Sequence, residues 1–176
     1  MTASESVLRD ACAADAAAMA AIYNHYVATT VISMESDPVG ADEMMRRLAD
    51  VQGAALPWLV LVDGGVVLGY AYASKWRARP GYRHAVESSV YVDAAQRGRG
   101  LGSTLYRALI ARLAGRFHCV IGGIALPNPA SVGLHERLGF RQVACFTEVG
   151  YKFGGWIDVG YWQLHLPASP SPEMSA

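Results

Sequence analysis

The sequence predicts a single α/β domain built on a mixed β-sheet. Stretches with the helical spacing of apolar residues alternate with stretches of strand character, and hairpin signals lie toward both ends of the expected sheet. The 176 residues are 52% hydrophobic and 17% charged, which is the composition of a compact globular protein with one sizeable core. We therefore expect one domain over residues 1–166, followed by a disordered Pro/Ser tail over residues 167–176.

Four helices are expected, over residues 15–28, 41–51, 100–113 and 130–138. In the first and third of them, apolar side chains recur at helical spacing and form one face. Asp37-Pro38 separates the first helix from the second. Gly139 is placed to end the fourth helix, because glycine readily takes the left-handed conformation found after helix ends.

Six strands are expected, over residues 58–62, 66–76, 86–92, 120–125, 143–151 and 156–166. Asp63-Gly64-Gly65 predicts the turn of a hairpin between the first two. In the third strand, alternation places Val86 and Ser88 on one face and Glu87 on the other. Strands and helices are mixed along the chain, which favours a mixed sheet flanked by helices.

Charge and cysteine content exclude several classes of protein. Lys and Arg number 15, and so do Asp and Glu, whereas a nucleic-acid-binding protein normally carries a net basic field. Cys12, Cys119 and Cys145 are widely spaced, and the histidines lack the spacing of metal ligands, so neither a disulfide framework nor a metal site is expected. The sequence has no signal peptide and no membrane-spanning run, which predicts a cytoplasmic protein that does not bind membranes.

A glycine-rich loop, Gln96-Arg97-Gly98-Arg99-Gly100-Leu101-Gly102, lies between an expected strand and an expected helix. Glycines allow a tight turn and the close approach of a ligand. The free N–H groups at the start of the following helix favour an anion, and the two arginines add positive charge for phosphates. Taken alone, the loop is equally consistent with a plain surface turn.

Two other phosphate-binding motifs are excluded by the surrounding residues. A dinucleotide-binding fold needs an acidic residue about 20 positions after the loop to hold the ribose. No Asp or Glu lies between Asp93 and Glu136. A P-loop needs Gly-Lys-Ser or Gly-Lys-Thr, and the sequence contains neither.

In combination with other segments, the loop resembles a known family. A strand, Arg97-x-x-Gly100-x-Gly102 and a helix resemble the pyrophosphate-binding signature of the GNAT superfamily of N-acetyltransferases, and the segment from Asn128 to Phe140 resembles its second motif. Further segments resemble the phosphinothricin and methionine sulfoximine acetyltransferases, namely residues 24–26, 57–60, 86–92, 102–106, 131–135 and 150–160. The similarity runs from Val7 to Leu166. It implies the GNAT fold, a mixed and mostly antiparallel central sheet flanked by helices.

The resemblance also implies a site for acetyl-CoA, with no metal. The cofactor-binding residues would be Val90, Tyr91, Val92, Arg97, Gly98, Arg99, Gly100, Leu101, Gly102, Ser103 and Asn128. A backbone N–H from the strand that ends at Val92 would donate to the thioester carbonyl. Asn128 would hydrogen-bond the pantetheine arm, although an asparagine at this place also suits simple capping of the helix.

Two residues carry the catalysis that the resemblance implies. Glu87 would act as general base toward the substrate ammonium, directly or through a water, with a pKa raised by partial burial. The alternative is a carboxylate on the solvated face of a strand. His135 would act as acid or proton relay toward the leaving thiolate. Its alternative is a structural histidine on a helix.

The segment from Ser74 to Arg83 resembles the family's substrate loop, and its arginines suit a carboxylate. The substrate-binding residues would be Met34, Trp76, Arg77, Ala78, Arg79, Tyr82, Arg83, Glu87, Ser88 and Tyr106. Two features depart from the phosphinothricin enzymes: Met34 stands where they place an aromatic residue over the substrate, and Pro80-Gly81 differs in the loop. Methionine sulfoximine and methionine sulfone are therefore substrates as strongly expected as phosphinothricin.

The expected function is transfer of acetyl from acetyl-CoA to the α-amino group of a small amino-acid-like substrate. Two alternatives stay open: a protein or peptide Nα-acetyltransferase, and a CoA-binding sensor without catalysis. By resemblance the protein forms a homodimer. The aromatic-rich C-terminal strands offer the interface, with Tyr151, Trp156, Tyr161 and Trp162.

Overall fold

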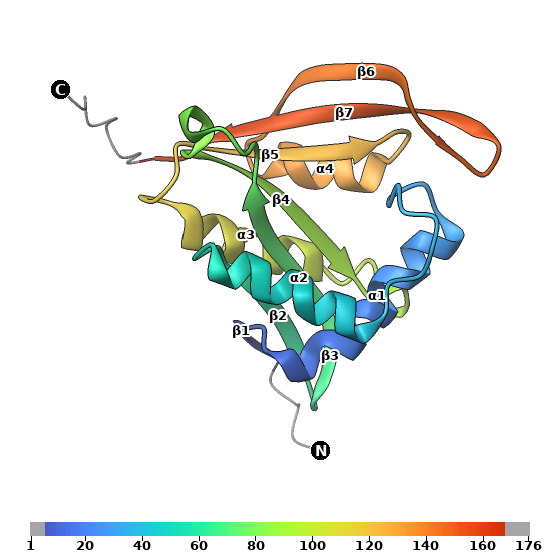
Figure 1. The fold of residues 1–176 in the computed structure, drawn as a ribbon, viewed down its shortest axis with the longest axis vertical. Helices are drawn as coiled ribbons and strands as arrows, with labels where there is room; N and C mark the ends of the chain where they lie inside the picture. Colours follow the sequence, from blue (N-terminus) through green and yellow to red (C-terminus); the bar gives the residue numbers. More distant parts are fainter. Residues whose placement is uncertain (1–5, 168–176) are drawn as a thin grey trace.

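The computed structural model describes residues 6–167, which form a seven-stranded sheet and four α-helices (Figure 1). The strands are β1 (Val7–Asp10), β2 (Trp58–Asp63), β3 (Val66–Lys75), β4 (Ala85–Val92), β5 (Cys119–Ala125), β6 (Arg141–Lys152) and β7 (Gly155–His165). Their order across the sheet is β1-β2-β3-β4-β5-β7-β6. Among these neighbours β4 and β5 are parallel and every other pair is antiparallel. The sheet is therefore mixed and mostly antiparallel, as predicted.

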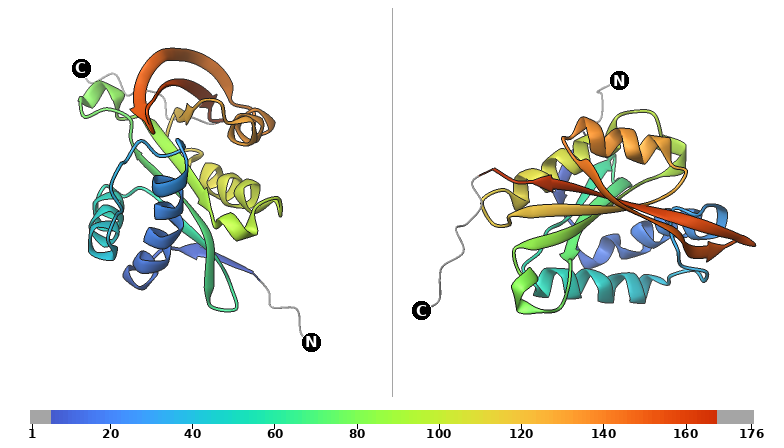
Figure 2. Two further views of the ribbon diagram at one scale, coloured as in Figure 1. Left: turned by 90° about the vertical axis from the view of Figure 1, so that its right-hand side faces the viewer. Right: turned by 90° about the horizontal axis from the view of Figure 1, so that it is seen from above.

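The helices cover both faces of the sheet (Figure 2). They are α1 (Ala16–Thr29), α2 (Ala41–Gly53), α3 (Leu101–Leu113) and α4 (Pro129–Arg137). Helices α1 and α2 lie on one face, and α3 and α4 lie on the other. Each face buries a separate apolar cluster, because the alternating side chains of the central strands point to both sides.

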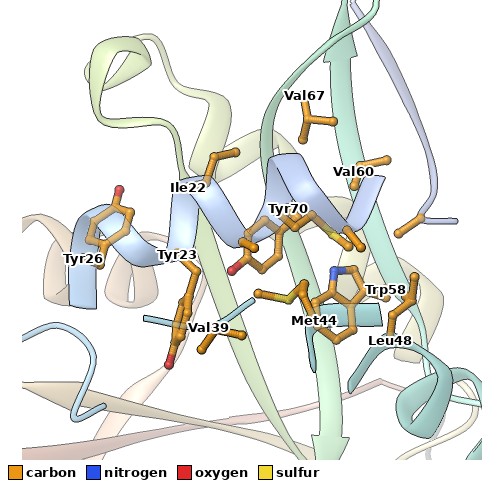
Figure 3. Packing of buried hydrophobic residues seen from close by; sticks show 14 of the residues in the cluster. Ile22, Tyr23, Tyr26, Val39, Met44, Leu48, Trp58, Val60, Val67 and Tyr70 are labelled. Atoms are coloured by element: carbon orange, nitrogen blue, oxygen red, sulfur yellow. The ribbon is translucent and has the colours of Figure 1, made fainter. Parts of the chain in front are cut away.

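The core between the sheet and helices α1 and α2 combines aromatic with aliphatic side chains (Figure 3). Tyr23 and Tyr26 of α1 pack edge-on against Tyr91 of β4, with ring centroids 5.1 and 5.5 Å apart. Trp58 stacks on Tyr72 at 4.2 Å. On the other face, aliphatic side chains of α3 such as Leu105 and Leu109 are fully buried against the sheet. These tyrosines hold α1 against the carboxyl-terminal part of β4.

The helices and strands expected from the sequence are confirmed, with bounds that differ by at most two residues, as in 143–151 against Arg141–Lys152. Strand β1 was not predicted, nor were three short 3₁₀ turns, at Ala13–Asp15, Pro80–Tyr82 and Ala94–Gln96. Residues 168–176 of the expected tail lie outside the described residues. Within the described part of the chain, no helix is long and apolar enough to cross a membrane.

Candidate active site

Strands β4 and β5 diverge in the middle of the sheet. They pair only through Ala85 with Cys119, Val86 with Val120, and Glu87 with Ile121. Beyond that point β4 continues to Val92 along β3, and β5 continues to Ala125 along β7. The two strands therefore open like a V toward their carboxyl ends, and their facing backbone edges line a gap there.

A cavity of about 570 Å³ lies at the wide end of this gap. It is lined by the last residues of β4, the glycine loop, and the starts of α3 and α4. Gly98 and Gly100 have φ values of 78° and 79°, which an L side chain rarely adopts, so these two positions require glycine. The N–H groups of the first turn of α3 have no intrahelical partner and favour an anion at this end of the cavity.

Arg97 lies at the mouth of the cavity, with its guanidinium over the ring of Tyr26 at 5.1 Å from the ring centroid. The Tyr26 hydroxyl donates a hydrogen bond to the backbone carbonyl of Val92. Tyr26 thus joins the end of β4 to the arginine of the loop. Arg99, by contrast, is not among the residues that line the cavity, and its guanidinium donates to the side chain of Gln96.

Asn128 lies where the cavity meets the gap, and it lines both. Its Oδ1 accepts the N–H of Ser131 at 3.1 Å, so it caps the amino end of α4. The capping interpretation of this residue is confirmed, and its position on the cavity wall leaves room for contact with a ligand as well.

Glu87 is half-buried on the α1 side of β4, and its Oε1 would lie 3.5 Å from a Cβ added at Gly123. Burial raises the pKa of Glu87, and the guanidinium of Arg77 opposes that rise. Arg77 in turn lies over the ring of Trp76 at 4.6 Å, and that ring meets Tyr161 edge-on at 5.7 Å. The carboxylate is therefore partly desolvated, with one cation acting on it and the ring of Tyr161 beside the same glycine, Gly123.

His135 lies on the opposite face of the sheet from Glu87. A Cβ added at Gly122 would stand 2.5 Å from His135 Nε2, whereas one at the next residue, Gly123, would face Glu87. Adjacent residues of a strand point to opposite faces. The two candidate catalytic side chains thus flank β5 from its two sides, close to the point where β4 and β5 diverge.

The imidazole of His135 is only 5% exposed, and both of its nitrogens have partners. Nδ1 lies 2.8 Å from the carbonyl oxygen of Ser131, which can only accept, so Nδ1 carries the proton. Nε2 then accepts from the hydroxyl of Tyr106 at 3.0 Å, and Tyr106 lies 2.6 Å from Oγ of Ser88. Burial lowers the pKa of His135, while the hydrogen bond with Ser131 opposes this effect.

The remaining predicted substrate residues fall into separate groups. Ser88 lines the gap, and Tyr106 is fully buried behind it in the core. Met34 is 41% exposed and covers Gly150 of β6. The loop before β4 surrounds a different cavity of about 270 Å³, whose lining includes Arg77, Ala78, Arg79, Tyr82 and Arg83 together with Phe117. From this loop, Arg77 acts electrostatically on Glu87, and Trp76 packs edge-on against Tyr161.

Several residues at the site were not predicted. They are Ile32, Ala130, Ser131, Leu134 and Arg137 on the cavity walls, Tyr26 beneath Arg97, and Tyr161 beside Trp76. The adjacent glycines of β5 carried a usable signal, because glycine inside a strand often marks a close approach of another group. Among residues 6–167, no group of three or more His, Cys, Asp or Glu side chains could hold a metal ion.

Comparison with known proteins identifies this architecture. The sequence model of the acetyltransferase (GNAT) domain matches residues 8–160. Phosphinothricin N-acetyltransferase of Streptomyces viridochromogenes is 44% identical over 168 residues, covering 94% of this chain and 91% of the relative. The L-methionine sulfoximine/L-methionine sulfone acetyltransferase of Salmonella typhimurium is 40% identical, covering 94% and 98%. A phosphinothricin acetyltransferase from Sinorhizobium meliloti, solved with acetyl-CoA, superposes with a TM-score of 0.91 at 35% identity, covering 97% of this chain and 95% of that one.

Proposed function

The chain belongs to the acetyltransferase (GNAT) family and is an acetyl-CoA-dependent N-acetyltransferase, and on this premise we propose that it acetylates the α-amino group of a small amino-acid-like substrate. The proposed substrates are of the phosphinothricin, methionine sulfoximine or methionine sulfone type, after the names of the relatives. The single observation that carries the proposal is the half-buried Glu87 at the point where β4 and β5 stop pairing.

The residues around the larger cavity fit acetyl-CoA. Its volume of about 570 Å³ suits a large cofactor, and the left-handed glycines leave the start of α3 open to phosphate oxygens. Arg97 makes no ion pair among the described residues, so its charge is available for a phosphate. When bound, acetyl-CoA supplies the acetyl thioester. The edge of β4 at Val90–Val92, which does not pair with β5, would supply backbone groups for the pantetheine arm and the carbonyl, apart from the Val92 carbonyl that accepts from Tyr26.

Glu87 is proposed as the general base. An amino-acid ammonium must lose a proton before its nitrogen can attack, and a carboxylate with a raised pKa accepts that proton more readily than an ordinary one. Arg77 is the cation that lowers the pKa of Glu87. We propose that its guanidinium binds the carboxylate of the substrate. Arg79 and Arg83, which line the separate cavity, are proposed to act on substrate only through the conformation of the loop.

His135 is proposed as a proton relay. In the neutral ring Nδ1 donates to Ser131 and Nε2 accepts from Tyr106, so Nε2 must first gain a proton before the ring can supply one. The hydroxyls of Tyr106 and Ser88 would then reverse and pass a proton toward the thiolate, and Nε2 would return to its unprotonated form. The leaving thiolate gains from any such proton. The alternative is a purely structural histidine, and the expected results for the two roles differ in the experiments below.

We further propose that the protein forms a homodimer through the outer face of the β6–β7 hairpin. Several large apolar residues there are each more than half exposed, namely Val143, Phe146, Val149, Tyr151, Phe153 and Trp156. An apolar surface of this kind on a small domain favours association. Trp162, expected above as part of the interface, is 2% exposed and packs in the core instead. Sedimentation of the wild type and of Trp156→Ser tests this proposal.

The activity is tested by release of free CoA, detected with a thiol reagent, from acetyl-CoA and a panel of amines. The panel contains phosphinothricin, methionine sulfoximine, methionine sulfone, common amino acids and a short peptide with a free N-terminal amine. The proposal predicts the highest kcat/KM for one of the first three compounds. A peptide as best substrate would support the Nα-acetyltransferase alternative, and no turnover with any amine would support the sensor.

A further inference from the structure

A buried lysine joins the β6–β7 hairpin to the segment that follows α1. Lys152, the last residue of β6, is 8% exposed, and its Nζ donates to two backbone carbonyls, those of Val27 and Ser33, each at 2.7 Å. These acceptors lie 125 and 119 residues away along the chain. Figure 1 shows the same arrangement, with the segment after α1 rising toward the hairpin.

Both acceptors need this partner. Val27 lies in the last turn of α1, where carbonyl groups have no intrahelical donor, and a cation there also complements the helix dipole. Ser33 is 3% exposed. Leaving a buried carbonyl without a donor is unfavourable, so the lysine helps to hold the backbone at Ser33 in place.

The next residue along this segment fits against the same strand. If Gly150, two residues before Lys152, carried a Cβ, that atom would lie 2.8 Å from Sδ of Met34. Residues two apart on a strand point to the same side. Gly150 therefore leaves the space in which the Met34 thioether lies, and Lys152 fixes the backbone one residue before it.

The opposite side of the segment is also held. The Ser33 hydroxyl lies 2.8 Å from the Tyr23 hydroxyl, which donates to Oε1 of Glu35 at 2.9 Å. Arg47 of α2 closes the group through two hydrogen bonds to the Glu35 carboxylate. Between these anchors, Ile32 lines both the large cavity and the gap. The segment over residues 30–35 is thus held on two sides, and through Ile32 it forms part of the wall of the site.

We propose that Lys152 and Gly150 are specificity-determining positions of this enzyme, which act by setting where Met34 lies against the side chain of the amine substrate. Lys152 fixes the backbone of the wall at Ser33, and Gly150 provides the seat for the thioether. The proposal rests on the proposed function, since it assumes a small amine bound between Glu87 and this wall. Both residues act through Met34 and the wall, so they are positioning residues.

The first test measures the seat of Met34 without any substrate. In protein labelled with ¹³C at the methionine methyl groups, the Met34 signal is assigned by its loss in Met34→Ala. Gly150→Ala and Lys152→Leu are expected to shift this signal, and the exposed control Val66→Ala is expected to leave it in place. An unchanged Met34 signal in both variants would overturn the proposal, whatever the enzyme acetylates.

The second test is a double-mutant cycle on the amine panel. Gly150→Ala is expected to lower kcat/KM for the preferred amine by about tenfold, and to change the ranking of amines by side-chain length. Its effect in the Met34→Ala background should be less than about twofold, because the clash is gone. KM for acetyl-CoA should be unchanged in all four proteins. Equal effects of Gly150→Ala in the two backgrounds would contradict the proposal.

The role of Lys152 is tested by comparing its variants with a core variant that only lowers the stability of the protein. Lys152→Leu should raise KM for the amine, and Lys152→Arg, which keeps a cation and donors, should recover part of the loss. Leu113 is buried in the core at the carboxyl end of α3, far from residues 30–35, so Leu113→Ala should lower stability without changing that segment. The order of kcat/KM values among the amines should be the same in this variant as in the wild type. A ranking unchanged in Lys152→Leu would contradict the role given to the lysine. Failure of the wild type to acetylate any amine would instead count against the proposed function.

Discussion

The hydroxyl of Tyr106 in α3 lies 3.0 Å from Nε2 of His135 in α4. Both helices pack on the face of the sheet opposite to Glu87. The same hydroxyl lies 2.6 Å from Oγ of Ser88, a residue on the edge of the gap. With Nδ1 of His135 protonated toward Ser131, Tyr106 donates to His135 and accepts from Ser88, whose hydroxyl also lies 3.3 Å from the carbonyl oxygen of Ile121. The chain of donors starts at the gap and ends inside α4.

Tyr106→Phe tests whether this chain has a role beyond stability. The variant keeps the ring and removes the hydroxyl, so Ser88 and His135 both lose a buried partner. We expect the free energy of unfolding to fall by about 1–3 kcal/mol, measured by urea denaturation. If the chain relays a proton, kcat also falls, on the order of 10²-fold, with KM for acetyl-CoA unchanged. A full kcat in the folded variant would leave His135 with a structural role only.

His135 also predicts how stability depends on pH. Its pKa is lowered in the folded protein from an ordinary value of 6.5. Below about pH 6.5 the unfolded chain therefore takes up a proton that the folded protein refuses, and stability falls as pH falls, by at most about 1.4 kcal/mol per pH unit. The loss ends below the folded pKa. Urea denaturation at several pH values should show a shallower slope in this window for His135→Gln than for the wild type, whereas equal slopes would contradict neutral burial.

The adjacent glycines of β5 give a matched pair of variants. A Cβ at Gly122 would stand 2.5 and 2.8 Å from two ring atoms of His135, while one at Gly123 would stand 3.3 Å from Tyr161 and 3.5 Å from Glu87. Gly122→Ala should therefore destabilise the protein by about 1–3 kcal/mol and displace the imidazole. Gly123→Ala should cost clearly less. Thermal unfolding of both compares them directly, and similar losses would show that the two residues do not face different environments.

Arg77→Gln predicts a shift in the pH profile of catalysis. The Arg77 guanidinium lowers the pKa of Glu87 against the larger effect of burial, so its removal should raise that pKa. Because the base must be ionised, the acid limb of kcat/KM should move to higher pH. Arg79→Gln is the matched control, since Arg79 is not among the groups that shift this pKa. A limb that stays in place in Arg77→Gln would mean that another group sets it.

Local patterns were sufficient to predict most of the fold. Apolar periodicity and the turn at Asp63-Gly64-Gly65 depend on near neighbours, and they gave helices and strands close to the observed bounds. Strand β1 escaped prediction because Val7-Leu8-Arg9-Asp10 is short and half charged. It is a strand through its pairing with β2, from Val7 with Val62 to Asp10 with Leu59, a partner about 50 residues away.

Local patterns placed some residues of the candidate site on the correct face of a strand, but they did not predict its geometry. Alternation along β4 correctly separated Glu87 from Ser88. No local pattern says that β4 and β5 stop pairing after Glu87 and Ile121, because both strands continue with their other neighbours. The sequence also predicted that the loop from Ser74 to Arg83 binds substrate as one unit. In the structure, most of this loop instead lines a separate cavity together with Phe117, which is distant in sequence and which no local pattern could have indicated.

The most direct test of the account is steady-state turnover of Glu87→Gln beside its affinity for acetyl-CoA. Glutamine keeps the size of the side chain and cannot accept the ammonium proton. The account predicts a kcat lower by about 10²-fold or more, with the acetyl-CoA dissociation constant within about twofold of the wild type. Full turnover by this variant with the preferred amine would contradict the assignment of Glu87 as the base, and with it the central claim.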